Sequence, residues 1–311
     1  MTRFTLASLV GSICVACAPQ ANAEGVAFIV PGFHQYAIDG DLDGYFDHFE
    51  QWGLEGDQVL AGEPFSPFRD GRDDLVVFRT NPMWGPGFYV KTQDHHRGFS
   101  GRFAQFSSWG NPYQGMGGDL STRAVIGDFD GDGRPQIAAL HQIVTSWSNA
   151  RCIRVDCNSD MAWVPYQGDR ARNLYSAALS IRDKLLAGRI GAATDEMMIW
   201  RDATGNWELF TTQNGVPGAS HFQTVQFGLP GDVPIVTDAN GDGVDDLLVF
   251  RPSNRTLYIN YYEPFAGQSG FGPNGDVDRT IDYSFPIYHT NLARGLPAYQ
   301  PWNLGGTGIR W

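Results

Sequence analysis

The chain has 311 residues, which is enough for one large domain or two ordinary ones with a sizeable core. Its 34 Asp and Glu residues outnumber its 22 Lys and Arg residues, and the net charge of −12 argues against a nucleic acid or an anionic membrane as partner. A protein that binds cations is instead consistent with this charge.

Residues 1–23 have the pattern of a secretory signal peptide. Arg3 precedes an apolar run over residues 4–18, and Ala21-Asn22-Ala23 forms a small-residue cleavage site. The mature chain would begin near Glu24 and, without Arg3, would carry a net charge of −13. A lipoprotein signal cut before Cys17 and an ordinary buried N-terminal segment are the alternatives. No later segment is long and apolar enough to cross a bilayer, so we expect a secreted, periplasmic or extracellular protein.

Short apolar runs separated by Gly, Pro, Asn and Asp predict many short strands rather than helices. Four of these runs align with one another, and each follows a loop. The runs are residues 74–79, 136–141, 196–201 and 246–251. We number the loop residues 1 to 9, with position 9 as the first residue of the run. Position 1 then falls at Ser66, Asp128, Gly188 and Asp238, at spacings of 62, 60 and 50 residues.

Each aligned run is followed by an aromatic strand and then by one further strand. The aromatic strands are residues 87–90, 161–164, 206–210 and 256–259, and the further strands are residues 103–109, 174–181, 221–227 and 279–285. Four strands per repeat of about 50–60 residues predict an all-β fold, a β-propeller of four-stranded blades, as a single domain over residues 24–311. A sandwich with chance similarity is the alternative.

We expect about five blades, of which four are complete and one is composite. Residues 33–52 resemble the last two strands of a blade, and residues 286–311 would supply its missing inner strands. Joining both chain ends in one blade would close the ring and remove two exposed sheet edges.

The loop over residues 238–246 has the pattern of a calcium site. Calcium takes oxygen ligands, here expected at positions 1, 3, 5 and 9, a backbone carbonyl at position 7, and Gly at the sharp turn at position 6. The side-chain ligands would be Asp238, Asn240, Asp242 and Asp246, with the carbonyl of Val244. An acidic hairpin turn without an ion is the alternative, since Asp, Asn and Gly are also common turn residues.

A second such loop covers residues 128–136. Asp128, Asp130 and Asp132 occupy positions 1, 3 and 5, and the carbonyl of Arg134 falls at position 7. Gln136 replaces the acid at position 9, which removes one charge and should lower the affinity for the ion. The other two aligned loops lack most of these acids, so we expect them to hold no ion.

A third acidic loop, over residues 39–50, matches the twelve-residue EF-hand loop but follows a strand rather than a helix. We therefore interpret it as a weaker calcium candidate at the edge of the composite blade. Its ligands would be Asp39, Asp41, Asp43, Tyr45, Asp47 and Glu50. Elsewhere in the mature chain, Cys152 and Cys157 predict a local disulfide in an oxidising compartment.

The motif Asp128-Phe129-Asp130-Gly131-Asp132-Gly133, followed by a short apolar strand and an aromatic strand, resembles the FG-GAP or VCBS repeat. The copy at residues 238–252 resembles it as strongly and ends in Phe250-Arg251-Pro252. The same repeat builds the propeller of integrin α-subunits. The resemblance implies a secreted propeller with calcium in some loops, used in adhesion or ligand binding, and it does not imply one activity.

No serine-nucleophile, zinc-protease or P-loop motif occurs in the sequence. We therefore expect a non-enzymatic module, stabilised by structural calcium, that binds an extracellular protein or a glycan. A hydrolase or lyase acting on polysaccharide, and an interaction domain of a secreted complex, are the alternatives.

Overall fold

The computed structural model describes residues 24–30, 35–53, 57–62, 73–81, 85–91, 103–106, 123–133, 135–144, 151–157, 170–174, 182–213, 218, 220–265, 268–271, 276–283 and 306–309. The described residues form β-strands, turns and loops, and none of them lies in a helix. The all-β prediction is therefore confirmed. No segment among these residues is a helix of the length and apolarity that crossing a bilayer would require. The expected signal peptide at residues 1–23 lies outside the described residues.

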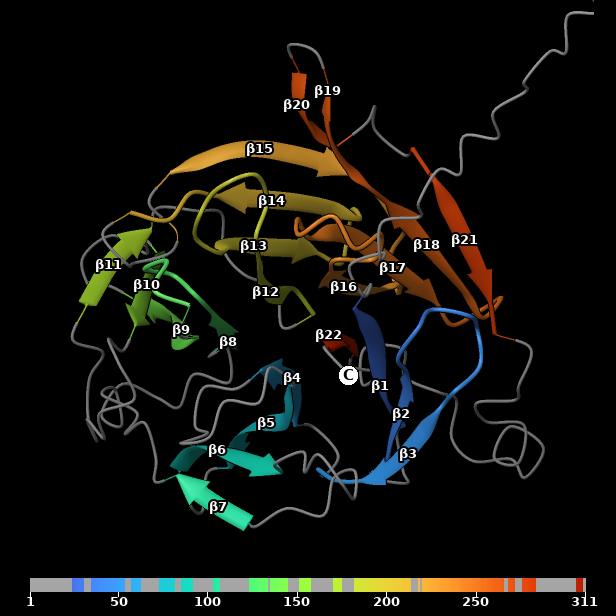
Figure 1. The fold of residues 1–311 in the computed structure, drawn as a ribbon. Helices are drawn as coiled ribbons and strands as arrows, with labels where there is room; N and C mark the ends of the chain where they lie inside the picture. The colour runs from blue at the N-terminus through green and yellow to red at the C-terminus, as the bar shows by residue number, and fades with distance from the viewer. Residues whose placement is uncertain are drawn as a thin grey trace, which may run out of the picture.

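Most strands belong to five four-stranded antiparallel sheets, which we number I to V (Figure 1). Sheet I has the order β22 (Gly306–Ile309), β1 (Gly25–Val30), β2 (Gln35–Asp39), β3 (His48–Gln51). Sheet II is β4 (Gln58–Gly62), β5 (Asp74–Asn81), β6 (Gly85–Lys91), β7 (Phe103–Phe106). Sheet III is β8 (Arg123–Gly127), β9 (Gln136–Val144), β10 (Arg151–Cys157), β11 (Arg170–Leu174).

The last two four-stranded sheets come from the C-terminal half of the chain. Sheet IV is β12 (Lys184–Gly188), β13 (Glu196–Arg201), β14 (Asn206–Phe210), β15 (His221–Gln226). Sheet V is β16 (Val233–Thr237), β17 (Asp246–Arg251), β18 (Thr256–Asn260), β21 (Arg279–Asp282). A two-stranded hairpin, β19 (Tyr262–Phe265) and β20 (Gln268–Phe271), is inserted between β18 and β21, and the sequence pattern did not predict it.

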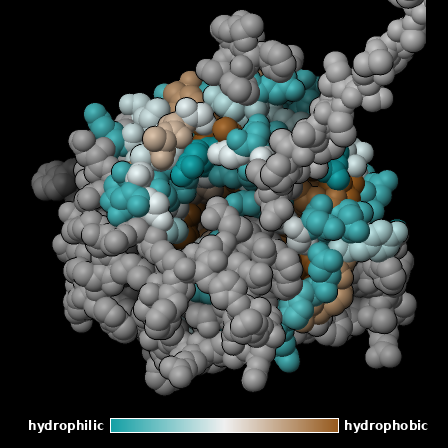
Figure 2. Space-filling view, viewed as in Figure 1, coloured by the Kyte–Doolittle hydropathy of each residue, from teal (hydrophilic) through white to brown (hydrophobic). Residues whose placement is uncertain are grey.

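The first strands of the five sheets surround the centre of the molecule (Figure 1). In order, β22 contacts β4, β4 contacts β8, β8 contacts β12, β12 contacts β16, and β16 contacts β22. Figure 2 shows hydrophobic side chains inside a hollow near the middle of this face. The five sheets thus radiate from a common centre.

The two ends of the described chain meet in sheet I. β22 pairs with β1, with Val26 opposite Gly308 and Phe28 opposite Gly306. The expectation that the C-terminal segment completes the first sheet is therefore confirmed. The detail differs, because the C-terminal segment supplies one described strand of this sheet rather than two, and β1 supplies the second.

Apolar side chains fill the spaces between neighbouring sheets. All but the last residue of β17 are buried, and alternate residues face opposite neighbours because the side-chain period of a strand is two. Leu248 and Phe250 pack with Phe28 of sheet I, whereas Leu247 and Val249 pack with Trp200 of sheet IV. The core is therefore a series of layers between sheets.

The strand positions predicted from the sequence agree with the structure in three of the four aligned copies. In sheet III the third strand is β10 rather than residues 161–164, and those residues lie outside the described part of the chain. The fourth strand there is β11, which ends at Leu174 instead of beginning there.

The predicted disulfide requires correction. Cys152 and Cys157 lie on one strand, β10, opposite Ile143 and Ala138 of β9. Residues five apart in a strand are separated by about 16 Å at a rise of about 3.3 Å per residue, whereas a disulfide needs Cα atoms within about 7 Å. Spacing in sequence suggested a closed loop, and the strand pairing keeps the segment extended.

Candidate metal-binding loops

The acidic loops lie at one end of the sheets. Successive strands of an antiparallel sheet reverse direction, so the connections from first to second strand and from third to fourth strand share one end. The loops 128–135, 189–195 and 238–245 join the first two strands of sheets III, IV and V. The loop 40–47 joins the last two strands of sheet I. We call this the loop end.

In the loop of sheet V, the position-1 carboxylate organises the backbone. Asp238 Oδ1 accepts hydrogen bonds from the backbone N–H groups of Gly241 (2.7 Å) and Asp242 (3.0 Å), and Oδ2 accepts one from Gly243 (2.8 Å). Gly243 has a φ of 86°, which favours glycine, so its predicted turn role is confirmed. At the tip, Asn240 Nδ2 donates to Asp242 Oδ2 (3.1 Å).

The loop of sheet III repeats this arrangement. Asp128 accepts hydrogen bonds from the backbone N–H groups at positions 4, 5 and 6, at 2.9, 3.1 and 2.9 Å. Asp128, Asp130 and Asp132 each offer a carboxylate oxygen, and these atoms lie within 4.8 Å of one another. The structure therefore brings the three predicted ligands together. Arg134 lies outside the described residues.

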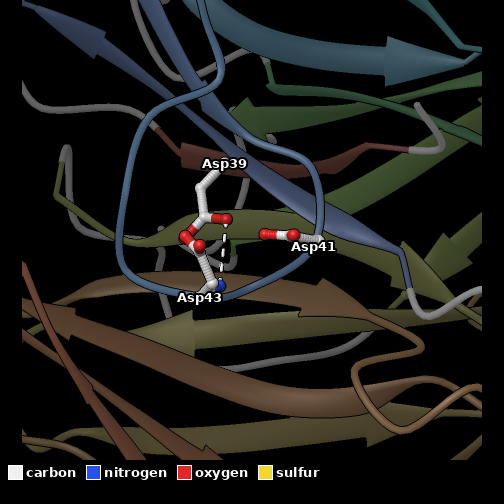
Figure 3. Close-up of side chains that lie close together, drawn as sticks. All are labelled: Asp39, Asp41 and Asp43. Carbon is white, nitrogen blue, oxygen red and sulfur yellow. Dashed lines mark hydrogen bonds between the residues drawn. The ribbon is translucent and has the colours of Figure 1, made fainter.

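The loop of sheet I forms a second group of three carboxylates within 4.8 Å, from Asp39, Asp41 and Asp43 (Figure 3). Asp39 is buried and also accepts a hydrogen bond from Tyr283 Oη (2.8 Å), whereas Asp41 and Asp43 are exposed. Tyr45 follows at the loop surface, and its N–H donates to Asp43 Oδ1 (2.8 Å).

Glu50, expected as a ligand at position 12, is not in this group. It lies on β3, and its carboxylate pairs with Lys91 of sheet II and with His48 Nε2 (3.3 Å). The structure thus brings together the carboxylates at positions 1, 3 and 5 of this loop, whereas Glu50 contacts another sheet, because a strand follows the loop in place of a helix.

The position-9 side chains close the bases of the loops. In four loops, one side-chain oxygen accepts a hydrogen bond from a backbone N–H near the start of the same loop. These bonds join Ala239 N to Asp246 Oδ2 (3.0 Å), Phe129 N to Gln136 Oε1 (2.7 Å), Ile190 N to Glu196 Oε2 (3.0 Å) and Gly40 N to Asp47 Oδ2 (2.8 Å).

Two of the position-9 residues make a second hydrogen bond. The other oxygen of Asp246 accepts from Tyr262 N (2.9 Å), and Gln136 Nε2 donates to Asp130 Oδ1 (2.9 Å). In the loops of sheets I and III the carboxylates that converge are those at positions 1, 3 and 5, whereas Asp47, Gln136 and Asp246 close the bases of their own loops.

Position-8 residues link neighbouring sheets. Asp195 N donates to Asp128 O (2.8 Å), and Asp128 N donates to Asp195 Oδ2 (2.7 Å). Asp245 forms the same two bonds with the backbone of Arg189, at 2.7 and 2.6 Å. Glu24, which precedes β1, donates its N–H to Asp238 O (2.8 Å). The loops of sheets III, IV and V are therefore each tied to the next sheet around the centre.

Burial is the main cause of the raised pKa values of the carboxylates in these loops. It raises the pKa of Asp246 to about 7 and that of Glu196 to about 7. Burial also raises the pKa of Asp195 to about 6, and the guanidinium of Arg189 opposes part of that rise. The pKa values of Asp39 and Asp238 are raised by burial as well. Clustered, partly desolvated carboxylates at the loop end favour a cation.

The donor sets are made of carboxylate oxygens, with an amide oxygen available at Asn240. Hard cations such as Ca²⁺ and Mg²⁺ prefer oxygen ligands, so the chemistry of these loops fits such an ion.

Sequence reasoning missed the position-8 acids and Arg189. A signal was present, because three of the aligned strands begin with the second member of an acidic pair, Asp73-Asp74, Asp195-Glu196 or Asp245-Asp246. The first member of the two later pairs bonds to the preceding sheet, and the second closes its own loop.

Comparison with known proteins gives little further guidance. No protein-family model matches the chain, and no curated protein matches it. Among solved structures, the chain is similar to an Agrocybe aegerita lectin described as specifically recognising non-reducing terminal N-acetylglucosamine. The two are 12% identical, the match covers 82% of this chain and 76% of the lectin chain, and the TM-score is 0.39. At that TM-score the similarity carries no argument about fold or ligand.

Proposed function

We propose that the chain is an exported, calcium-binding β-propeller of five blades, similar to FG-GAP or VCBS repeat proteins. It acts as a non-enzymatic module for binding or adhesion to an extracellular protein or glycan. The observation that supports this proposal best is the placement of the acidic loops of sheets I, III and V, which lie at the same end of their sheets, while the first strands of all five sheets contact one another in a ring.

In this proposal the ion is structural. Bound calcium would supply positive charge to the carboxylates at positions 1, 3 and 5 of the loops 39–47 and 128–136, and to those at positions 1 and 5 of the loop 238–246, where position 3 is Asn240. The backbone N–H groups around Asp128 and Asp238 already hold the position-1 carboxylates in place. Less of the loop then needs to be ordered when the ion binds, and the loop end becomes a firmer surface for a ligand.

The first test is a melting curve of the mature protein in chelator and in 10 mM calcium, with bound ions counted by native mass spectrometry. For sites with Kd values of about 10⁻⁴–10⁻³ M, calcium at this concentration stabilises the fold by about 1.4–2.7 kcal/mol per site. We expect a higher Tm in calcium and two or three bound ions.

The variant Asp242→Ala removes a position-5 carboxylate whose side chain also bonds to Asn240 and Val244 within the exposed tip. It should lose one ion and part of the calcium-dependent rise in Tm, while Asp276→Ala, an exposed aspartate outside the three candidate loops, should keep both. An equal drop in Tm with and without calcium would mean that Asp242 acts only as a turn residue.

The ligand is tested by binding the calcium-loaded protein to a glycan array and to a panel of purified extracellular proteins, each with a chelator control. Calcium-dependent retention on either surface supports the binding module. Turnover of a polysaccharide substrate by the purified protein would instead favour an enzyme.

A further inference from the structure

We propose that Arg189 is a tethered counter-cation that weakens metal binding by the neighbouring loop 128–136. This inference rests on the proposed function, because it concerns the affinity of one of the proposed calcium loops. The loop of sheet IV offers no carboxylate at positions 1, 3 or 5. The proposal gives one of its residues a role in setting the metal affinity of the neighbouring loop.

The strand register identifies Arg189 as the position-1 residue of its loop. The last pairs of the first two strands are Gly127 with Gln136, Gly188 with Glu196, and Thr237 with Asp246. These pairs enclose residues 128–135, 189–195 and 238–245, so the loop of sheet IV is one residue shorter than the other two. Alignment from the following strand placed Gly188 at position 1, and the pairing shows that Gly188 is the last residue of β12.

The backbone bonds support the same assignment. Asp195 and Asp245 at position 8 donate their N–H groups to the carbonyls of Asp128 and Arg189, respectively. Asp128 and Arg189 are therefore equivalent, and the loop of sheet IV carries a guanidinium where the other loops carry the central carboxylate.

Arg189 is placed to act on the loop of sheet III. Its Nη2 lies 4.0 Å from Asp128 Oδ2, and the Asp128 side chain is only 9% exposed, whereas that of Arg189 is 45% exposed. The two loops are also in contact, because a Cβ added to Gly131 would meet Thr194 and the carbonyl of Ala193. The cation is thus held beside Asp128 by the chain itself.

An acid lies beside the position-1 residue of both loops, Asp195 beside Asp128 and Glu24 beside Asp238. Glu24 donates its N–H to the carbonyl of Asp238, and its carboxylate accepts a hydrogen bond from Thr237 Oγ1 (3.1 Å). A metal ion in either loop would lie near an acid, and one in the loop of sheet III would also lie near the guanidinium of Arg189. The structure therefore predicts a higher calcium affinity for the loop of sheet V.

The test is a calcium titration of the full mature protein by calorimetry, comparing the wild type with Arg189→Gln. The substitution keeps the backbone bonds to Asp245 and removes the charge. We expect the affinity of one site to rise about three- to tenfold, since the pair is partly exposed and screened. The gain should shrink at high salt. Adding Asp130→Asn to Arg189→Gln should remove the site that gained affinity.

Two further variants separate the charge from other effects. Arg189→Lys keeps the charge and should retain the wild-type affinity. Arg182→Gln removes a comparable exposed cation of the same segment, which lies 3.9 Å from Asp202 and away from the loop end, and should change nothing.

The outcomes distinguish the two proposals. If the wild type binds calcium and Arg189→Gln leaves every site unchanged, the role of Arg189 is overturned while the proposed calcium binding stands. If neither protein binds calcium, both proposals fail. If Arg182→Gln also binds calcium more tightly, the effect comes from the net charge of the protein, and the specific role of Arg189 is overturned.

Discussion

Position 9 of the loops shows how one bond can be made by different side chains. Gln136, Glu196 and Asp246 each accept a backbone N–H from near the start of their own loop. The amide does so without charge, whereas the two acids are buried and their pKa values rise to about 7. The charge at this position is therefore dispensable for closing the loop, and it has an energetic cost at neutral pH.

This predicts that Glu196→Gln stabilises the protein at alkaline pH. Because the folded pKa of about 7 exceeds the ordinary value of 4.5, the folded state holds its proton more tightly, and the free energy of unfolding falls as pH rises from about 4.5 to 7. The variant avoids this loss, so at pH 8 it should exceed the wild type by about 1–3 kcal/mol, with no difference near pH 4.5.

Urea unfolding at pH 4.5, 6 and 8 in calcium-free buffer measures this effect. The control is Glu263→Gln, an exposed acid on the hairpin. If the free energies of unfolding of Glu196→Gln and the wild type change in parallel with pH, ionising Glu196 in the folded protein has no cost in stability, and the prediction is wrong.

At the scale of the strand, an arginine ends the second strand of sheets IV and V and bonds to nearby acids. β17 ends in Arg251, whose Nε and Nη2 bond to the two oxygens of Asp232 at 2.9 and 2.8 Å, at the end opposite the loops. β13 ends in Arg201, which bonds to Asp183 and Glu208. In both sheets an acid just before the first strand binds the arginine that ends the second.

Removing the acid should destabilise the sheet. The Asp232 side chain is buried and also accepts a hydrogen bond from Leu229 N (2.9 Å), so Asp232→Ala leaves Arg251 and a backbone donor without their partner. We expect a loss of about 2–4 kcal/mol in the free energy of unfolding. Urea denaturation measures this, with Glu263→Ala as the exposed control, and a loss below about 0.5 kcal/mol would contradict the role of the pair.

At the scale of the whole molecule, β22 joins the first and last strands of the described chain. It pairs with β1 and contacts β16 and β4, so it connects sheets V, I and II. Without it, β1 would present an unpaired edge, and the contact between the first strands would be interrupted.

Deleting residues 306–311 should therefore lower Tm by about 10 °C or more and broaden the transition. Deleting only residues 310–311 keeps β22 and is the matched control. Circular dichroism melts in chelator measure both, so that ion binding does not contribute. Equal melting of the two truncated proteins would mean that the other sheets hold the ring without its closing strand.

The sequence by itself determined the strands and the loop tips. Runs such as 246–251 are apolar on both faces, which suits a strand packed between two sheets, and Asp and Gly at fixed spacing favour one compact turn. These are local preferences, so the strand class, most strand positions and the carboxylates at positions 1, 3 and 5 followed from the residues alone.

Only the tertiary structure decided which oxygens converge and which groups neighbour them. Asp246 accepts a hydrogen bond from Tyr262 N, at the start of the inserted hairpin, and Glu50 pairs with Lys91 of another sheet. The pairing of β10 with β9 keeps Cys152 and Cys157 apart, although they are close in sequence. Arg189 reaches Asp128 across a boundary between sheets that no local pattern records, because such contacts depend on how the sheets pack around their common centre.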